Sequence, residues 1–212
     1  MAYRLIKKLI PLKLKTFLKK KRRFNSINSL DKKLLKYVNF RNGYYIECGA
    51  NDGVNQSNTW HYEKFLNWEG ILIEPNKEKY NQLKKNRNKN NIFINKALVS
   101  KFYQNKYIYI SNENLESKVA YDFNSTNIKC KTTTLEDILI KKNIKKKIDL
   151  FSLDVEGYEM EVLKGVDFNK FMIKYILIET YNLELVSRYL SNYNYSFIEK
   201  LSKLDYLFVK TK

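Results

Sequence analysis

From about residue 40 onward, short apolar runs alternate along the chain with longer polar stretches that carry apolar residues at helical spacing. Apolar runs of this length predict buried strands, and the stretches between them predict helices. The expected strands occupy residues 43–49, 70–75, 91–100, 148–154 and 175–180, and the expected helices occupy residues 57–68, 76–89, 132–139 and 184–193. This β-α-β-α-β order predicts an α/β fold with a parallel sheet and helices on both of its faces.

Two regions depart from this alternation. Residues 195–201 and 205–210 are strand-like runs joined by a short polar link, which predicts a closing antiparallel hairpin. Residues 101–111 alternate like a strand or a hairpin, and residues 112–127 are expected to form a loop. A connection this long in a compact domain is often functional. In the following helix, Thr134 and Asp137 have the spacing of a capping box.

The N-terminal segment, residues 1–23, differs from the rest of the chain. It holds ten Lys or Arg residues and no acidic residue, and its apolar residues fall on two short helical faces on either side of Pro11. One interpretation is a basic amphipathic helix that contacts an anionic membrane or an acidic partner. The simpler interpretation is a helix that is solvated or packed on the domain. We therefore divide the chain into a basic leader, 1–23, and a domain, 24–212.

The net charge of +18 is weak evidence about function, because the leader alone supplies ten of the 40 basic residues. The charge alone does not indicate a nucleic-acid partner. No apolar run approaches the roughly 18–20 residues of a membrane-spanning helix. Cys48 and Cys130 form no paired motif. A reducing, cytoplasmic location is expected, at a membrane surface if the leader binds lipid.

A glycine turn follows the first expected strand. The chain has only six glycines, and Gly49 and Gly53 stand four residues apart between this strand and a helix, the arrangement of a nucleotide-type cofactor site. We expect Gly49 to permit a sharp turn and Gly53 to permit a close approach of the backbone to a ligand. The spacing is not G-x-G-x-x-G, and Asn51 stands at its centre, which counts against a nicotinamide cofactor.

Carboxylates surround this turn. Glu74 closes the second expected strand, where an acid typically accepts hydrogen bonds from ribose hydroxyls. Glu47 and Asp52 add negative charge near the same turn. Three carboxylates would repel a pyrophosphate but suit a positively charged ligand such as a sulfonium. The alternative is that Glu47 and Asp52 only cap the turn. Taken together with Glu74, the three acids favour the cofactor interpretation, and Glu47 is expected among the cofactor-binding residues.

Two long blocks, residues 47–76 and 148–165, resemble the hallmark blocks of the FkbM-type S-adenosylmethionine-dependent methyltransferases, and the resemblance extends over about residues 40–212. It implies a class I methyltransferase (Rossmann-like) fold with seven strands. It also implies methyl transfer to oxygen, often to a sugar hydroxyl. Asn51 departs from the wider class of methyltransferases but not from this family. The residues that the resemblance places at S-adenosyl-L-methionine are Gly49, Ala50, Asn51, Asp52, Gly53 and Glu74, with Asn95 and Ala97 near the adenine.

The expected catalytic residues follow the fourth strand. Asp154 stands at its carboxyl end and Glu156 two residues beyond, at the edge where doubly wound sheets form their ligand crevice. A carboxylate there could take the proton of a hydroxyl that is being methylated. Glu159 and Glu161, on the following helix, are expected to face solvent.

Two other roles are weighed against this assignment. Asp154 and Glu179, which end adjacent strands, could bind Mg²⁺, but two acids make an incomplete site and a metal-free reaction is favoured. His61 is the single histidine, and we expect it at the surface with no part in catalysis.

The leading functional hypothesis is an O-methyltransferase that acts on a carbohydrate or a similar polar acceptor. A ribose-directed RNA methyltransferase is the second, motivated by the charge, although no aromatic-rich RNA-binding appendage is evident. The N/D-P-P-Y motif of amino methylation cannot occur, because Pro11 and Pro75 are the only prolines. The third is a non-catalytic, membrane-associated module that has kept the fold, but the acids at 74, 154 and 156 argue against it.

Overall fold

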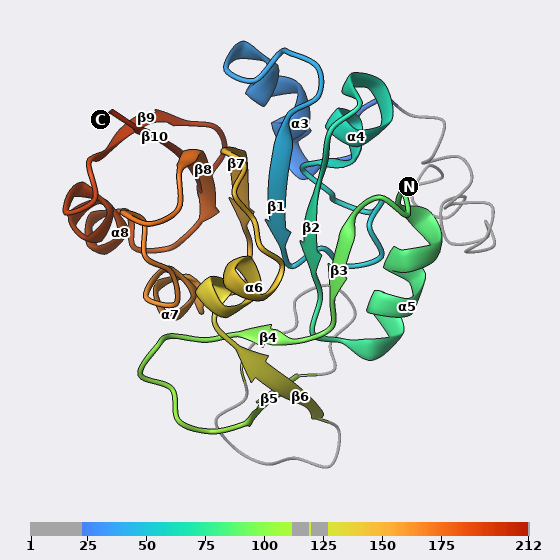
Figure 1. Ribbon diagram of the computed structural model, residues 1–212. Helices are drawn as coiled ribbons and strands as arrows, with labels where there is room; N and C mark the ends of the chain where they lie inside the picture. Colours follow the sequence, from blue (N-terminus) through green and yellow to red (C-terminus); the bar gives the residue numbers. More distant parts are fainter. Residues whose placement is uncertain (1–22, 112–118, 120–126, 212) are drawn as a thin grey trace, which may run out of the picture.

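The structure is a computed structural model, and it describes residues 23–111, 119 and 127–211. Its centre is a seven-stranded sheet (Figure 1) in the order β3-β2-β1-β7-β8-β10-β9. Five strands are parallel, and β10 runs antiparallel between β8 and β9. This is the topology of a class I methyltransferase, and it confirms the predicted fold and hairpin. The strands of the sheet are β1 (Tyr44–Cys48), β2 (Glu69–Ile73), β3 (Ile92–Ile94), β7 (Ile148–Leu153), β8 (Ile173–Glu179), β9 (Tyr195–Lys200) and β10 (Asp205–Lys210).

Helices cover both faces of this sheet, each over its own core. Because side chains alternate along a strand, Ile46 packs into one core and its neighbour Tyr45 into the other. One face is covered by α6 (Leu135–Lys141), α7 (Glu159–Leu163) and α8 (Leu183–Ser191). The opposite face is covered by α3 (Leu30–Lys33), α4 (Trp60–Leu66) and α5 (Lys77–Asn86). The remaining helical turns are η1 (Ile27–Ser29) and η2 (Leu34–Lys36).

Side-chain caps fix where three helices begin. The Thr134 hydroxyl accepts a hydrogen bond from the Asp137 backbone N–H at 3.0 Å, which confirms the predicted start of α6. Asn76 accepts from the backbone of Glu78 and caps α5 in the same way. Asn182 caps α8. Such caps satisfy backbone N–H groups that have no partner inside the helix.

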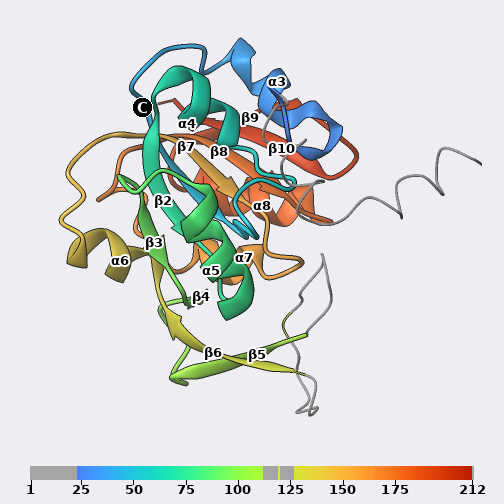
Figure 2. The ribbon, with the colours of Figure 1, turned by 90° about the vertical axis from the view of Figure 1, so that its right-hand side faces the viewer.

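The prediction of a single strand at 91–100 was wrong, because this segment forms two strands that belong to different sheets. After β3 the chain leaves the main sheet, and β4 (Ala97–Leu98) pairs instead with β6 (Ile128–Thr133). A second partner of β6 is β5 (Tyr107–Ile110), which the sequence did predict. The resulting three-stranded sheet lies at the end toward which β1 and β2 point (Figures 1 and 2). Residues 112–118 and 120–126 of the expected loop lie outside the described residues.

The segment that precedes β1 belongs to the domain. Leu30, Leu34 and Val38 are buried in the core on the α3–α5 face. His61 is buried as well, which corrects its expected surface position: its Nδ1 lies 2.8 Å from the Arg23 carbonyl oxygen, and its ring stacks on Phe24. The expected leader helix falls on residues outside the described ranges, apart from Arg23.

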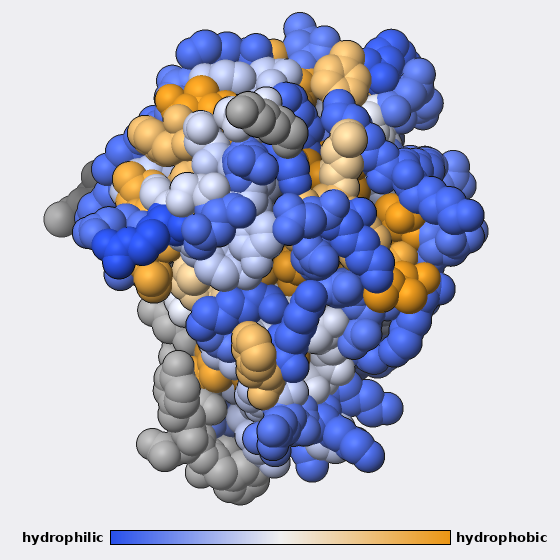
Figure 3. Space-filling model, turned by 60° about the vertical axis from the view of Figure 1, so that its left-hand side comes forward, coloured by the Kyte–Doolittle hydropathy of each residue, from blue (hydrophilic) through white to orange (hydrophobic). Residues whose placement is uncertain are grey.

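Where the structure describes the chain, no helix is both long enough and apolar enough to cross a membrane. One face of the molecule (Figure 3) is largely hydrophilic, with hydrophobic side chains in scattered groups. Isolated exposed apolar residues are normal on a protein surface and indicate no contact site by themselves.

Candidate functional site

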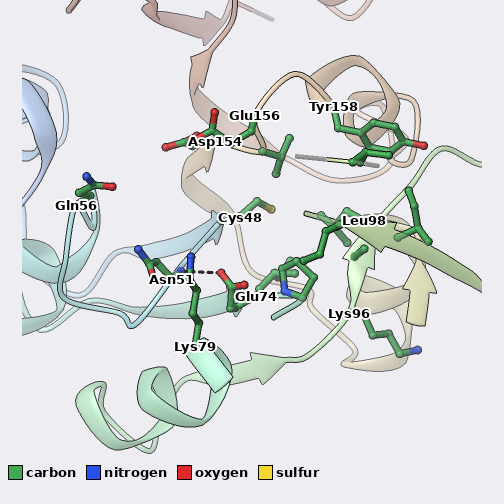
Figure 4. A pocket seen from close by; sticks show the side chains of 18 of the residues that line it. Cys48, Asn51, Gln56, Glu74, Lys79, Lys96, Leu98, Asp154, Glu156 and Tyr158 are labelled. Carbon is green, nitrogen blue, oxygen red and sulfur yellow. Dashed lines mark hydrogen bonds between the residues drawn. The ribbon is translucent and has the colours of Figure 1, made fainter. Parts of the chain in front are cut away.

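A pocket opens where the carboxyl ends of β1, β2 and β7 meet the small sheet (Figure 4). It encloses about 910 Å³, including its open mouth. Its lining residues are Cys48, Gly49, Asn51, Asn55, Gln56, Ile73, Glu74, Pro75, Lys79, Lys96, Ala97, Leu98, Ile108, Ile110, Val119, Asp154, Val155, Glu156 and Tyr158.

The glycine turn joins the ends of three strands. Gly49 has a φ of +76°, and a Cβ built on it would lie 1.9 Å from the Asp154 carbonyl oxygen. Glycine is therefore required, because any side chain would separate the ends of β1 and β7. Asn51, also left-handed with a φ of 49°, donates its backbone N–H to the Glu74 carboxylate at 2.9 Å. The turn is thus held against the end of β2.

Glu74 is the buried acid of the pocket. One carboxylate oxygen accepts from the Asn51 N–H and the other from the Asn76 N–H. Burial raises the pKa of Glu74, while these hydrogen bonds and the nearby Lys79 oppose the rise. Each carboxylate oxygen has two lone pairs, so the side chain keeps capacity to bind a hydroxyl in the pocket. Asn95 supports this end of β2, because its amide donates to the carbonyl oxygens of Glu74 and Pro75.

Glu47 and Asp52 hold the loop around the turn through hydrogen bonds, and their expected contact with the cofactor stays a prediction. The Glu47 carboxylate accepts from the Ser57 hydroxyl, the Asn58 N–H and the Thr59 hydroxyl. Asp52 accepts from two backbone N–H groups of its own turn, one at 2.9 Å and one at 2.7 Å. Both carboxylates are buried, and neither lines the pocket.

Ala50 and Gly53 also lie outside the pocket lining. Ala50 is buried in the core on the α3–α5 face. A Cβ on Gly53 would lie 2.6 Å from Leu83 and 2.7 Å from the Arg87 side chain. Glycine is needed there because α5 packs against the turn, and the expected approach of Gly53 to a ligand stays a prediction.

Sequence analysis did not predict most of the residues on the apolar side of the pocket. Ile108 and Ile110 of β5 line it, together with Val119 and with Leu98 beside the predicted Ala97. The strict alternation of residues 107–110 was the available signal, because it predicts one buried face. That face could not be assigned to the pocket without knowing that β5 belongs to a second sheet.

Four acids gather around the end of β7. Asp154 follows β7, and Glu179 ends the adjacent strand β8, where the antiparallel register places it opposite Asp205. Burial, followed by the charges of Glu179 and Glu156, raises the pKa of Asp154 well above its usual range. Burial and the charge of Asp205 raise the pKa of Glu179 to about 7. Both carboxyl groups therefore keep a proton to a higher pH than an ordinary carboxyl group does.

The loop that follows Asp154 is held in an unusual conformation. Glu156 has a left-handed φ of 55° and lines the pocket, and Gly157 follows it with a φ of +97°. Glu159 is buried, because its carboxylate accepts from the Gly157 N–H at 2.7 Å. The expectation that Glu159 faces solvent was wrong for this reason. Glu161 is partly exposed and pairs with Lys164 at 2.7 Å.

Asp154 and Glu179 do lie together, as the metal alternative requires. In the ranges that the structure describes, no group of three or more His, Cys, Asp or Glu side chains is arranged to hold a metal ion. Both cysteines are buried thiols, and burial is the main cause that raises the pKa of Cys48 and of Cys130.

Comparison with known proteins places the chain in a family. Residues 47–206 match the methyltransferase FkbM domain. Similar solved structures include methyltransferase FkbM from Methylobacillus flagellatus KT, with 16% identity, a TM-score of 0.49, and coverage of 82% of this chain and 45% of that one. Others are a fibrillarin/Nop5p complex (11% identity, TM-score 0.44, coverage 86% and 79%) and the human methyltransferase 10 domain containing protein (10% identity, TM-score 0.42, coverage 85% and 78%).

A search of curated proteins gave no match. The chain spans less than half the length of the Methylobacillus methyltransferase. The domain match, in contrast, covers most of the present chain and includes the two sequence blocks that carry the resemblance. The chain therefore belongs to the FkbM methyltransferase family.

Proposed function

We propose that this protein is an S-adenosylmethionine-dependent O-methyltransferase that methylates a hydroxyl of a sugar or of a similar polar acceptor. The observation that carries the proposal is that Glu74 and Asp154, from strands on either side of β1, line one pocket. In this proposal Glu74 binds the donor molecule and Asp154 accepts a proton.

The chemistry of the pocket fits the cofactor. S-adenosylmethionine combines a hydroxylated ribose, an aromatic base and a positively charged sulfonium. Glu74 offers hydrogen-bond acceptors for hydroxyls, and Ile73, Leu98 and Ile108 offer an apolar surface for a base. Asp154 and Glu156 favour a positive charge over a negative one. When bound, the cofactor supplies an electrophilic methyl group.

The protein would contribute positioning and proton transfer. The acceptor oxygen gains a methyl group and must lose its proton, and Asp154 is the carboxyl group placed to take it. The charge of Glu179, at the end of the adjacent strand, raises the pKa of Asp154 and so helps it to hold that proton. A proton acceptor works best when its pKa is near the working pH, and burial together with the charges of Glu179 and Glu156 raises the pKa of Asp154 toward that range. The proton then passes to solvent.

The test separates cofactor binding from chemistry. Calorimetry should show that the wild-type protein binds S-adenosylmethionine, and that Glu74→Ala weakens binding by about 1–3 kcal/mol, the scale of a lost hydrogen bond to a charged group. Asp154→Asn should retain affinity but slow labelled methyl transfer into a host glycan fraction by about 10²–10⁴-fold. A correctly folded wild-type protein that does not bind the cofactor would refute the proposal.

A further inference from the structure

A second hollow lies on the other side of Asp154 from Glu74. It encloses about 490 Å³, including open space. Asp154 and Gln56 line both hollows, so the two spaces meet at these side chains. The other lining residues are Ile27, Asn28, Leu30, Asn58, Glu179, Ser202, Lys203, Leu204 and Asp205.

Distant parts of the chain are fastened together to form this hollow. The Thr180 N–H donates to the Leu204 carbonyl at 2.9 Å and holds the turn between β9 and β10 against the end of β8. A backbone bridge joins Ser26 to Gln56, and the buried Asp31 carboxylate accepts from the Ser26 hydroxyl at 2.6 Å. The walls are therefore fixed by hydrogen bonds, which is a property of preformed binding sites.

Asn58 provides an independent sign of a ligand. Its side chain is 7% exposed, and its amide nitrogen donates to the Ser152 hydroxyl at 3.1 Å. The amide oxygen is buried, and among the described residues it has no hydrogen-bond partner. Buried polar atoms normally have a partner, because leaving one unsatisfied is costly. A donor group of a bound molecule would satisfy this oxygen.

The hollow presents hydrogen-bond acceptors and negative charge. Three carboxyl groups, those of Asp154, Glu179 and Asp205, line it together with Asn58. Lys203 is the single cationic residue among the described lining residues, and it is exposed at the rim. Hydroxyl groups can donate to such a surface, whereas phosphate and carboxylate groups cannot and would be repelled.

We propose that this hollow binds the methyl acceptor and selects a neutral polyhydroxylated group, with no anionic substituent beside the hydroxyl that is methylated. The assignment rests on the proposed function and adds the place and the chemistry of the acceptor. Methyl transfer is an in-line displacement, so donor and acceptor must approach from opposite sides. Two hollows that meet at Asp154 provide separate sites for the two molecules.

The probe is a matched set of p-nitrophenyl glycosides: neutral glucoside, galactoside, mannoside and rhamnoside, with the glucuronide and galacturonide as carboxylate counterparts. Saturation-transfer NMR on the full chain, with S-adenosylhomocysteine present, measures their binding. The glucoside or the galactoside should bind at least about tenfold more tightly than its uronide. This is expected because the uronide anion would face carboxyl groups of the same charge. Asn58→Leu should weaken that binding by about tenfold, the scale of one lost hydrogen bond.

A second variant tests the same hollow in case Asn58→Leu does not fold. Asp205→Asn removes one negative charge from the wall of the second hollow. The variant should therefore show a smaller difference in affinity between the glucoside and the glucuronide. Calorimetry with S-adenosylhomocysteine and thermal melting of both variants check the cofactor pocket, which neither Asn58 nor Asp205 lines. If S-adenosylhomocysteine binds but no neutral glycoside does, or if uronides bind as tightly as neutral glycosides, the acceptor assignment is overturned. If the wild-type protein does not bind S-adenosylhomocysteine, the proposed function itself is wrong.

Discussion

Replacing Arg87 by Met tests how the site is supported. The Arg87 guanidinium has no solvent exposure, and it pairs with Glu63 at 2.7 Å and with Glu47 at 3.2 Å. It also donates to the Tyr45 hydroxyl and the Thr59 hydroxyl. One side chain thus fastens β1 and α4 to the loop after the glycine turn.

The expected loss can be worked out from this burial. Removing one member of a buried ion pair typically costs about 3–5 kcal/mol, because the remaining charge is left in a poorly solvated place. For a chain of this size each kcal/mol lowers the melting temperature by about 2–4 °C, so the variant should melt about 6–20 °C below the wild type. Burial alone would raise the pKa of Glu63, and Arg87 brings it below the usual range instead. Without Arg87 the Glu63 carboxylate can take up a proton, so the decrease in melting temperature should be smaller at pH 5 than at pH 8.

Thermal unfolding followed by circular dichroism at both pH values is the assay. Lys36→Met is the matched control, because Lys36 lies 3.1 Å from Glu199, nearly the distance in the Arg87–Glu47 pair, but the two side chains are 67% and 41% exposed. Exposed pairs contribute little, so this control should melt like the wild type. If Arg87→Met also melts like the wild type at pH 8, the reasoning from burial is wrong.

Three further predictions concern the strand ends. Gly49→Ala should lower both the melting temperature and the affinity for S-adenosylhomocysteine, because its Cβ would lie 1.9 Å from a carbonyl oxygen of Asp154; normal calorimetry and melting would contradict this. Single-turnover methyl transfer should increase as the pH rises through about 7, because the Asp154–Glu179 pair, which faces Glu156 and Asp205, must release a proton before it can accept one. A flat profile would argue against the pair. Glu179→Gln should raise the melting temperature at pH 8 but not at pH 5, because a carboxyl with a raised pKa loses folded-state stability as the pH rises through that window.

The main sheet could be predicted because its signals are local. Strands such as 44–48 and 148–153 are short, mostly apolar runs that are buried along their whole length, and the glycine turn and the helix caps follow from single residues. The division of residues 91–100 could not be predicted, because it depends on Asn95, whose amide binds the carbonyl oxygens of Glu74 and Pro75. A contact of this kind, across about 20 residues, leaves no periodic signal in the sequence.

The site shows the same division. Glu74 and Asp154 were predictable because the carboxyl ends of parallel strands share one edge. Glu47 was assigned to the cofactor because an acid near a turn has the same sequence pattern whether it faces a ligand or binds its own loop. Its partner Arg87 lies 40 residues away, and the group that buries His61, the Arg23 carbonyl, lies 38 residues away. Only the folded chain shows these pairs.

The carboxyl groups near the site lie in two opposite environments, and the contrast supports the proposed catalytic role of some of them. Glu47 and Glu63 are neutralised by Arg87, an arrangement that serves to hold the loop in place. Within the described part of the chain, no Lys or Arg forms an ion pair with Asp154 or Glu179. Close carboxyl groups without a cation oppose folding, and neutral residues of similar size would be more stable there. Groups that work against stability tend to occur at functional sites, so this cost itself argues that the acids at the ends of β7 and β8 serve the reaction.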